Sequence, residues 1–203
     1  QKVVGVDIDQ ELLDLAQKQY AKRKNIQLYK ADAEELPFEE NSFDVVIIYE
    51  ALYYLSEPDK FIRQAKRVLR PGGILLICSA NCELSNFNPS PFSHKYFSAC
   101  ELFNLLSRSG FSNIEILGDC KLDTRSFKAR VLAFIKKQAV NLHLIPKTMK
   151  GKEFLKRIFM GKLVLMPPEI DDSLGQYTPP LKIDFDKPEC LHKVIFSVAY
   201  NQK

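Results

Sequence analysis

Hydrophobic residues follow two different spacings in the first half of the chain. Four short runs of mainly β-branched and other apolar residues have the length of strands, and two of the segments between them carry apolar residues at helical spacing. The expected strands are residues 3–7, 26–31, 43–49 and 74–78, and the expected helices are residues 10–23 and 59–69. Strands that alternate with helices are typical of a doubly wound, mostly parallel α/β sheet.

Local patterns make this prediction more specific. The helix at residues 10–23 carries apolar residues spaced for one buried face, namely Leu12, Leu13, Leu15, Ala16 and Tyr20. The nearly unbroken apolar run at residues 43–49 predicts a strand that is buried on both faces. We expect Ser56 or Asp59 to cap the helix at residues 59–69, and Pro71-Gly72-Gly73 to end it.

The second half of the chain is less regular. A polar loop at residues 81–96 is long enough to cover a site at the edge of the sheet. A helix is expected at residues 98–109 and strands at residues 114–117 and 192–200. The long segment before the last strand contains an amphipathic helix near residues 126–144, a basic stretch, and a proline-rich region at residues 167–188.

Composition and charge narrow the class of protein. Hydrophobic residues make up 46% of the 203 residues and charged residues 27%, which fits a folded domain and excludes a disordered chain. The five cysteines form no C-x-x-C pair and the histidines match no zinc spacing. We therefore expect reduced thiols, a cytoplasmic location and no metal. Charge is uneven, since residues 119–165 carry 12 basic and 3 acidic side chains.

Two carboxylates at strand ends are the main candidates for ligand binding. Asp7 closes the first expected strand, and Asp32 follows the second. In an open parallel sheet, ligands bind outside the carboxyl ends of the strands, where an acid can accept hydrogen bonds from ribose hydroxyls. The sequence therefore predicts half of a nucleotide-binding fold. The alternative for Asp7 is a solvated turn residue or a helix cap, although Asp9 is the better cap for the helix that begins at Gln10.

Four motifs occur in an order and spacing that resemble a known family. The segments VVGVDID, ADAEELPF, FDVVIIYEALYYL and RVLRPGGILL together resemble the class I S-adenosylmethionine-dependent methyltransferases, in particular their small-molecule group. The segment NPSPFSHKYFSACELFNLLSRSGF, with the basic region after it, is similar to bacterial methyltransferases that act on cell-surface polysaccharide. The resemblance implies a Rossmann-like fold and S-adenosyl-L-methionine as cofactor.

The same resemblance implies that the chain begins at the second strand of the family's sheet. The family's first strand lies in the middle of that sheet, and it and its glycine-rich loop would be absent from this sequence. We expect unpaired strand edges, an open core and weak cofactor binding by this chain alone. The implied domains are a methyltransferase core at residues 1–118, a basic insertion on the acceptor side at residues 119–190, and the final core strand at residues 191–203.

The resemblance also assigns cofactor-binding roles to individual residues. Asp7 would accept both ribose hydroxyls, and Ile8 would pack on the adenine face, although Ile8 could equally be a core residue. The carboxylate of Asp32 would meet the adenine amino group, and the backbone N–H of Ala33 would meet a ring nitrogen. Tyr49 would face the methyl donor at the end of its strand.

Two residues are candidate catalytic bases, because a sugar hydroxyl must lose its proton as it is methylated. Glu50 lies where family members face the donor and the acceptor, and it is the first candidate. His94, in the loop over the site, is the second. Glu50 could instead be a helix-capping or surface acid, and His94 an ordinary surface residue.

The implied function is methyl transfer to a small-molecule or glycan acceptor. The basic residues of segment 147–166, interleaved with apolar ones, indicate an anionic or lipid-linked acceptor, or peripheral contact with a membrane surface. They are Lys147, Lys150, Lys152, Lys156, Arg157 and Lys162. The same pattern is typical of a solvated face over an apolar underside. Nucleic acid is not expected as a partner, since no nucleic-acid-binding module accompanies the charge.

Two other functions remain open at this point. One is a nicotinamide-dependent oxidoreductase, since an acid that ends the second strand can also bind the ribose of NAD. The ADAEELPF segment argues against NAD. The other is a non-catalytic module that keeps the fold and binds the cofactor without turnover.

Overall fold

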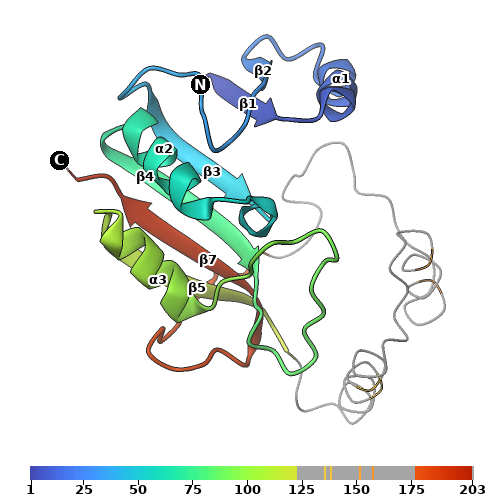
Figure 1. Ribbon diagram of the computed structural model, residues 1–203, viewed down its shortest axis with the longest axis vertical. Helices are drawn as coiled ribbons and strands as arrows, with labels where there is room; N and C mark the ends of the chain where they lie inside the picture. Colours follow the sequence, from blue (N-terminus) through green and yellow to red (C-terminus); the bar gives the residue numbers. More distant parts are fainter. Residues whose placement is uncertain (123–134, 136–137, 139–150, 152–156, 158–176, 203) are drawn as a thin grey trace.

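The computed structural model describes residues 1–122, 135, 138, 151, 157 and 177–202. Within these residues, strands and helices alternate as the sequence predicts (Figure 1). The first elements are β1 (Val3–Asp7), α1 (Gln10–Gln19), β2 (Ile26–Lys30), β3 (Phe43–Tyr49), the 3₁₀ helix η1 (Leu52–Tyr54) and α2 (Pro58–Val68). They are followed by β4 (Leu69–Ala80), α3 (Ala99–Arg108), β5 (Ser112–Lys121), β6 (Leu181–Lys182) and β7 (His192–Tyr200).

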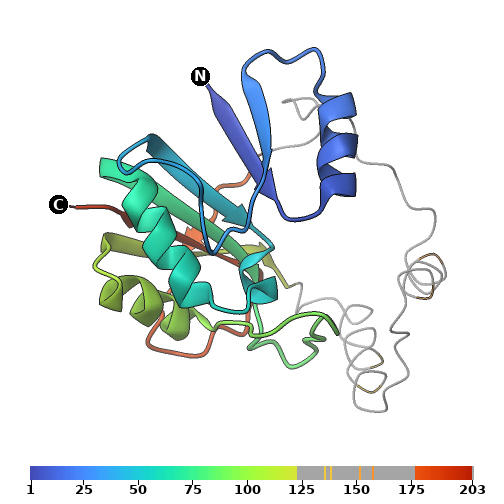
Figure 2. The same ribbon diagram turned by 45° about the horizontal axis from the view of Figure 1, so that its top comes forward.

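The described strands form two sheets. β1 and β2 pair in parallel, and the second sheet has the order β3-β4-β7-β5-β6. β3 and β4 are parallel, whereas β7 runs antiparallel to both β4 and β5. The fold is therefore α/β, as predicted, with a parallel part at the β3 end and an antiparallel part around β7. β1 and β3 point toward the same side of the molecule (Figure 2).

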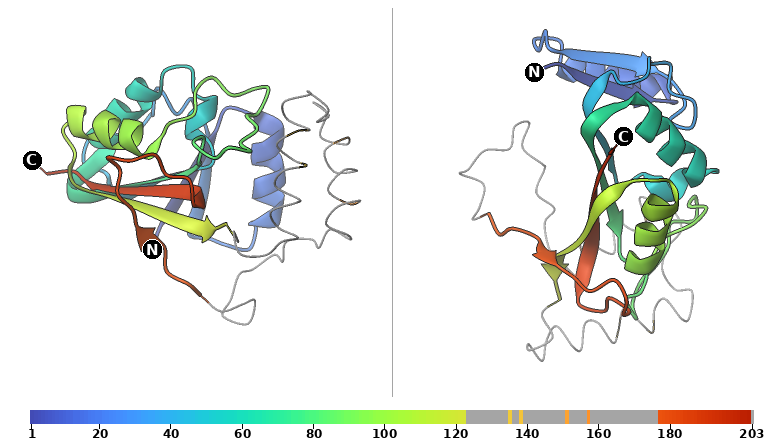
Figure 3. Two further views of the ribbon diagram at one scale, coloured as in Figure 1. Left: turned by 90° about the horizontal axis from the view of Figure 1, so that it is seen from below. Right: turned by 90° about the vertical axis from the view of Figure 1, so that its left-hand side faces the viewer.

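The core lies between the five-stranded sheet and two helices. α2 and α3 cover the same face of this sheet, as the edge-on view shows (Figure 3). Their buried apolar residues pack against residues of β4, β5 and β7, including Leu75, Ile116 and Ile195. α3 begins with a capping box, in which Ser98 and Glu101 each accept a hydrogen bond from the other's backbone N–H.

The predicted buried face of α1 is wrong. The helix ends at Gln19 instead of Arg23, and Leu13 is its one buried residue, whereas Leu12, Leu15 and Tyr20 are exposed. An amphipathic pattern predicts which side of a helix can be buried, but burial also needs an opposing surface. Here α1 packs on the two-stranded sheet of β1 and β2, which is too narrow to cover the whole apolar face.

The prediction that β3 is buried on both faces is also wrong. Val46 and Ile48 face the core, but Val45, Ile47 and Tyr49 on the other face are exposed, and Ile47 is 61% exposed. β3 is an edge strand of its sheet, because the described strands leave the side opposite β4 unpaired. This arrangement agrees with the expected unpaired edges.

A groove separates β1 from β3. It has a volume of about 960 Å³ and is lined by apolar residues of both strands, among them Val3, Val4, Val45 and Ile47, together with Phe38. Polar contacts connect α2 to the loop between β2 and β3. Arg67 of α2 donates hydrogen bonds to the backbone oxygens of Phe38, at 2.6 Å, and Leu36, at 2.8 Å.

The cap of α2 differs from the prediction. Glu57, not Ser56 or Asp59, is the N-cap, and its side chain makes no capping hydrogen bond. Instead, its backbone N–H donates to the carboxylate of Glu34, which also accepts from the Ser56 hydroxyl. The helix ends at Val68, before the Pro71-Gly72-Gly73 turn, and this turn lies within β4.

The later elements lie where the sequence predicts them. α3 and β7 match their expected ranges closely, and β5 is longer than expected because it extends to Lys121. The expected helix near residues 126–144 and nearly all of segment 147–166 lie outside the described residues. In the part of the chain that the structure describes, no helix is long and apolar enough to span a membrane.

Candidate active site

The first part of the candidate site lies at the carboxyl ends of β1 and β2. The parallel register pairs Asp7 with Lys30, and the Asp7 carbonyl accepts a hydrogen bond from the N–H of Ala31 at 3.1 Å. Asp32 therefore follows β2 at the same sheet edge at which Asp7 ends β1. The structure brings together the two acids that the sequence singled out.

Each of these two carboxylates is oriented by its own loop. One oxygen of Asp7 accepts the backbone N–H of Asp9 at 2.8 Å, and one oxygen of Asp32 accepts the backbone N–H of Glu34 at 2.8 Å. A carboxylate has two oxygens and about four acceptor positions, so each acid can still accept hydrogen bonds from a ligand. Asp9 caps α1 through its own carboxylate, as expected.

The neighbouring residues have different environments. Ile8 is 69% exposed, so it is not a core residue, and its side chain is accessible to a ligand ring. Ala33 is half-buried and packs against the core. An exposed apolar residue directly after Asp7 is consistent with a contact to the adenine face.

The second part of the site lies at the end of β3. Glu50 follows Tyr49 and has a φ of 52°, in the left-handed region that residues other than glycine seldom adopt. Its N–H donates to the Cys78 carbonyl of β4 at 2.9 Å. Its carboxylate accepts the Tyr53 hydroxyl at 2.7 Å, and the Cys78 sulfur lies 3.8 Å from the other oxygen. Strained backbone at a strand end is a common feature of functional sites.

The groups around Glu50 remain protonated at neutral pH. Burial raises the pKa of the Cys78 thiol to about 11. Burial, followed by the hydrogen bond to Glu50, also raises the pKa of Tyr53. Cys78 raises the pKa of Tyr49, whose exposed ring lies 6.4 Å from that of Phe196. Within this cluster, the Glu50 carboxylate is the hydrogen-bond acceptor for the Tyr53 hydroxyl.

His94 lies near this cluster without joining it. Its backbone N–H donates to the Tyr53 carbonyl at 2.8 Å, and the residue is exposed. The loop at residues 81–96 therefore contacts η1, which follows β3, but no hydrogen bond described for the His94 side chain connects it to Glu50. Among the two candidate bases, Glu50 has the more defined position.

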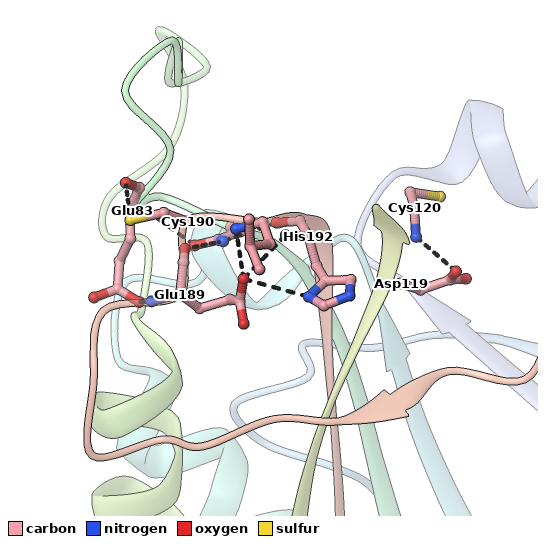
Figure 4. Close-up of polar contacts among 8 residues, drawn as sticks. Glu83, Asp119, Cys120, Glu189, Cys190 and His192 are labelled. Carbon is pink, nitrogen blue, oxygen red and sulfur yellow. Dashed lines mark hydrogen bonds and ion pairs between the residues drawn. The ribbon is translucent and has the colours of Figure 1, made fainter. Parts of the chain in front are cut away.

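Three buried ionisable residues near these loops were not predicted from the sequence. Glu34 is 7% exposed and joins the loop after β2 to the start of α2. Glu189 and His192 form the second group (Figure 4), with 3.3 Å between a Glu189 oxygen and Nδ1 of His192. Glu34 binds Glu57, and Asn81 binds the carbonyls of Glu189 and His192, across long stretches of sequence, so no local pattern indicates these contacts.

The Glu189–His192 pair fixes the start of β7 beside the end of β4. One Glu189 oxygen accepts the backbone N–H groups of Leu191 and His192, and Asn81 donates from its amide to the carbonyls of Glu189 and His192. The His192 ring packs against Gly118 of β5. These contacts join the segment before β7 to the end of β4 and to β5. Within the described residues, no group of three acidic, histidine or cysteine side chains could hold a metal ion.

Comparison with known proteins shows what the chain is similar to. Residues 1–77 match the family model described as a methyltransferase domain. The chain is 29% identical over 123 residues to a probable S-adenosylmethionine-dependent methyltransferase of Mycolicibacterium smegmatis, covering 58% of this chain and 46% of that protein. It is 35% identical over 108 residues to the ubiquinone/menaquinone biosynthesis C-methyltransferase of Hahella chejuensis, covering 52% of this chain and 43% of that protein.

A solved structure shows the same fold. The S-adenosylmethionine-dependent methyltransferase of Thermotoga maritima, described as a possible histamine N-methyltransferase, superposes with a TM-score of 0.60 at 15% identity, covering 98% of this chain and 73% of that one. The chain spans less than half the length of the two curated relatives above. Motifs, sheet order and relatives agree: residues 1–77 match a methyltransferase domain, and the chain is similar to S-adenosylmethionine-dependent methyltransferases.

Proposed function

We propose that the protein transfers a methyl group from S-adenosylmethionine to a small-molecule or glycan acceptor. The observation that carries this proposal is the position of Asp7 and Asp32 at the ends of adjacent parallel strands. A nucleoside held at such an edge can donate hydrogen bonds from its ribose hydroxyls to one acid and from its adenine amino group to the other. The named methyltransferase relatives support the same chemistry.

The residues present fit this cofactor. Asp7 retains acceptor capacity after its contact with Asp9, and Ile8 presents an exposed apolar side chain beside it. Asp32 and the backbone of Ala33 offer an acceptor and a donor for the adenine edge. When bound, S-adenosylmethionine supplies a methyl group on a positively charged sulfur, so the protein has chiefly to position and align the reactants.

Glu50 is the proposed general base. Its carboxylate lies at the end of β3, accepts hydrogen bonds from groups that stay protonated, and has acceptor positions that remain available. It takes the proton that an acceptor hydroxyl loses as its oxygen bonds to the methyl group. His94, on the covering loop, is the second candidate for this role.

The acceptor is proposed to be anionic or lipid-linked. The support is the charge of residues 119–165, which carry 12 basic and 3 acidic side chains. The same region is the proposed site of peripheral membrane contact, through residues 147–166. The five free cysteines support a cytoplasmic location, because reduced thiols are typical of that compartment.

The proposal is tested with the natural full-length protein. Titration calorimetry with S-adenosylhomocysteine and, separately, with NAD distinguishes a methyltransferase site from a nicotinamide site. We expect saturable binding of S-adenosylhomocysteine and none of NAD. Release of S-adenosylhomocysteine from S-adenosylmethionine, assayed with a panel of lipid-linked and nucleotide-linked sugars, then tests turnover. Binding without turnover on any acceptor would favour a non-catalytic module.

A further inference from the structure

Tyr53 connects the covering loop to Glu50. The residue lies in η1, directly after β3, and is only 7% exposed. Its hydroxyl donates to one oxygen of the Glu50 carboxylate at 2.7 Å. A hydrogen bond to an ionised acceptor is shorter and stronger than one between neutral groups. This contact therefore restricts how the Glu50 side chain can rotate.

The Tyr53 ring is itself held on two sides. It stacks on Tyr96 with 4.2 Å between ring centroids, and it meets Tyr54 edge-on at 4.6 Å. Tyr96 in turn meets Phe87 edge-on at 4.7 Å, so the loop at residues 81–96 supplies one wall of this aromatic group. The Tyr53 carbonyl accepts the His94 N–H. The Tyr53 hydroxyl therefore belongs to a ring whose position is fixed by its neighbours.

The backbone of Glu50 provides an independent indication. A left-handed conformation at a residue other than glycine costs of order 1 kcal/mol and persists only where neighbours enforce it. At Glu50, the hydrogen bond from its N–H to the Cys78 carbonyl and the side-chain bond to Tyr53 stabilise it.

We propose that Tyr53 is the positioning residue for Glu50, holding its carboxylate in the orientation that accepts the acceptor's proton. This inference rests on the proposed function, in which Glu50 is the base. The covering loop takes part through Tyr96, which fixes the ring of Tyr53. Tyr53 does not exchange protons with the acceptor.

The test is a double-mutant cycle in the natural full-length protein, with Tyr53→Phe, Glu50→Gln and both together. Tyr53→Phe keeps the ring and its stacking, so the fold and the affinity for S-adenosylmethionine are expected to stay unchanged. kcat is expected to fall about tenfold, as for loss of one charge-assisted hydrogen bond. In the Glu50→Gln background, Tyr53→Phe is expected to have no further effect. Tyr54→Phe, at the exposed neighbouring ring, is the matched control and is expected to keep wild-type kcat.

Three results would overturn the proposal: additive losses in the cycle, a loss in S-adenosylmethionine affinity that accounts for the effect of Tyr53→Phe, or an equal loss in Tyr54→Phe. Crystal structures of wild type and Tyr53→Phe give a readout independent of turnover. We expect the Glu50 carboxylate to change orientation in the variant, and an unchanged orientation would contradict the positioning role. An inactive wild type would instead contradict the proposed function.

Discussion

Glu34 accepts a hydrogen bond from the backbone N–H of Glu57 at 2.8 Å, across 23 residues of sequence. Glu34 follows β2, and Glu57 caps α2, so this bond joins the two-stranded sheet to the five-stranded sheet. The bond satisfies a helix N-terminus that has no side-chain cap of its own. It thereby fixes the position of Asp32, two residues away, relative to the end of β3.

Replacing Glu34 with Gln is expected to lower the free energy of unfolding by about 1 to 3 kcal/mol at neutral pH, since the buried carboxylate accepts from both Glu57 and Ser56. Urea denaturation followed by circular dichroism measures this. Glu35→Gln, at the adjacent exposed residue, is the matched control and is expected to have no effect.

The effect of Glu34→Gln depends on pH. The backbone N–H of Glu57 lowers the pKa of the Glu34 carboxyl, so the ionised form stabilises the fold above its unfolded-state pKa. This contribution is lost as the pH falls through the lowered folded-state pKa. The stability difference between wild type and variant should therefore shrink from about pH 5 downwards. A difference that is constant down to acid pH would show that the ionised carboxylate is not the cause.

Asp7→Ala is expected to weaken the binding of S-adenosylmethionine at least tenfold, or about 1.4 kcal/mol, because the ribose hydroxyls lose their acceptor. Titration calorimetry with the full-length protein measures the affinity. Asp14→Ala, on the exposed part of α1, is the control. Equal affinity of Asp7→Ala and wild type would remove Asp7 from the cofactor site.

Glu50→Gln is expected to lower kcat about a hundredfold, as for loss of a general base, while leaving the affinity for S-adenosylmethionine unchanged. Glu57→Gln is the control, because its exposed side chain makes no capping bond. Steady-state kinetics measures kcat, and calorimetry measures the affinity for S-adenosylmethionine. If Glu50→Gln turns over at the wild-type rate, Glu50 has a structural role.

Gly118→Ala is expected to destabilise the fold by about 1 to 3 kcal/mol through overpacking. A Cβ at this position would lie 2.6 Å from the His192 ring, which is buried and cannot easily move. In a His192→Ala background the loss of stability caused by Gly118→Ala should be smaller. Thermal unfolding of wild type, the two single variants and the double variant tests this. An equal cost in both backgrounds would mean that the clash with His192 is not the reason.

The positions of the strands and helices could be predicted because they depend on local patterns. β3 and β7 occupy their expected ranges, Asp7 ends its strand and Asp32 follows its strand, as proposed. Burial could not be predicted from the same patterns. Leu15 and Ile47 have apolar spacing but lack an opposing surface, and burial depends on elements that a local pattern does not reveal.

The polar contacts of the site were predictable only in part. Tyr53 and Glu50 are three residues apart, so a contact between them could have been suspected from the sequence. Asn81 and Glu189 are 108 residues apart, and Glu34 and Glu57 are separated by a complete strand. Contacts between residues so far apart in sequence depend on the tertiary fold, which brings distant segments together. The left-handed backbone at Glu50 also has no sequence signal, since it is enforced by β4.

The most direct measurement is a crystal structure of the natural full-length protein with bound S-adenosylhomocysteine. The account predicts that the ribose hydroxyls lie within about 3 Å of the Asp7 carboxylate, with the adenine against Ile8 and within hydrogen-bond reach of Asp32. A nucleoside bound at any other edge, or Asp7 and Asp32 side chains directed into bulk solvent in the complex, would contradict it.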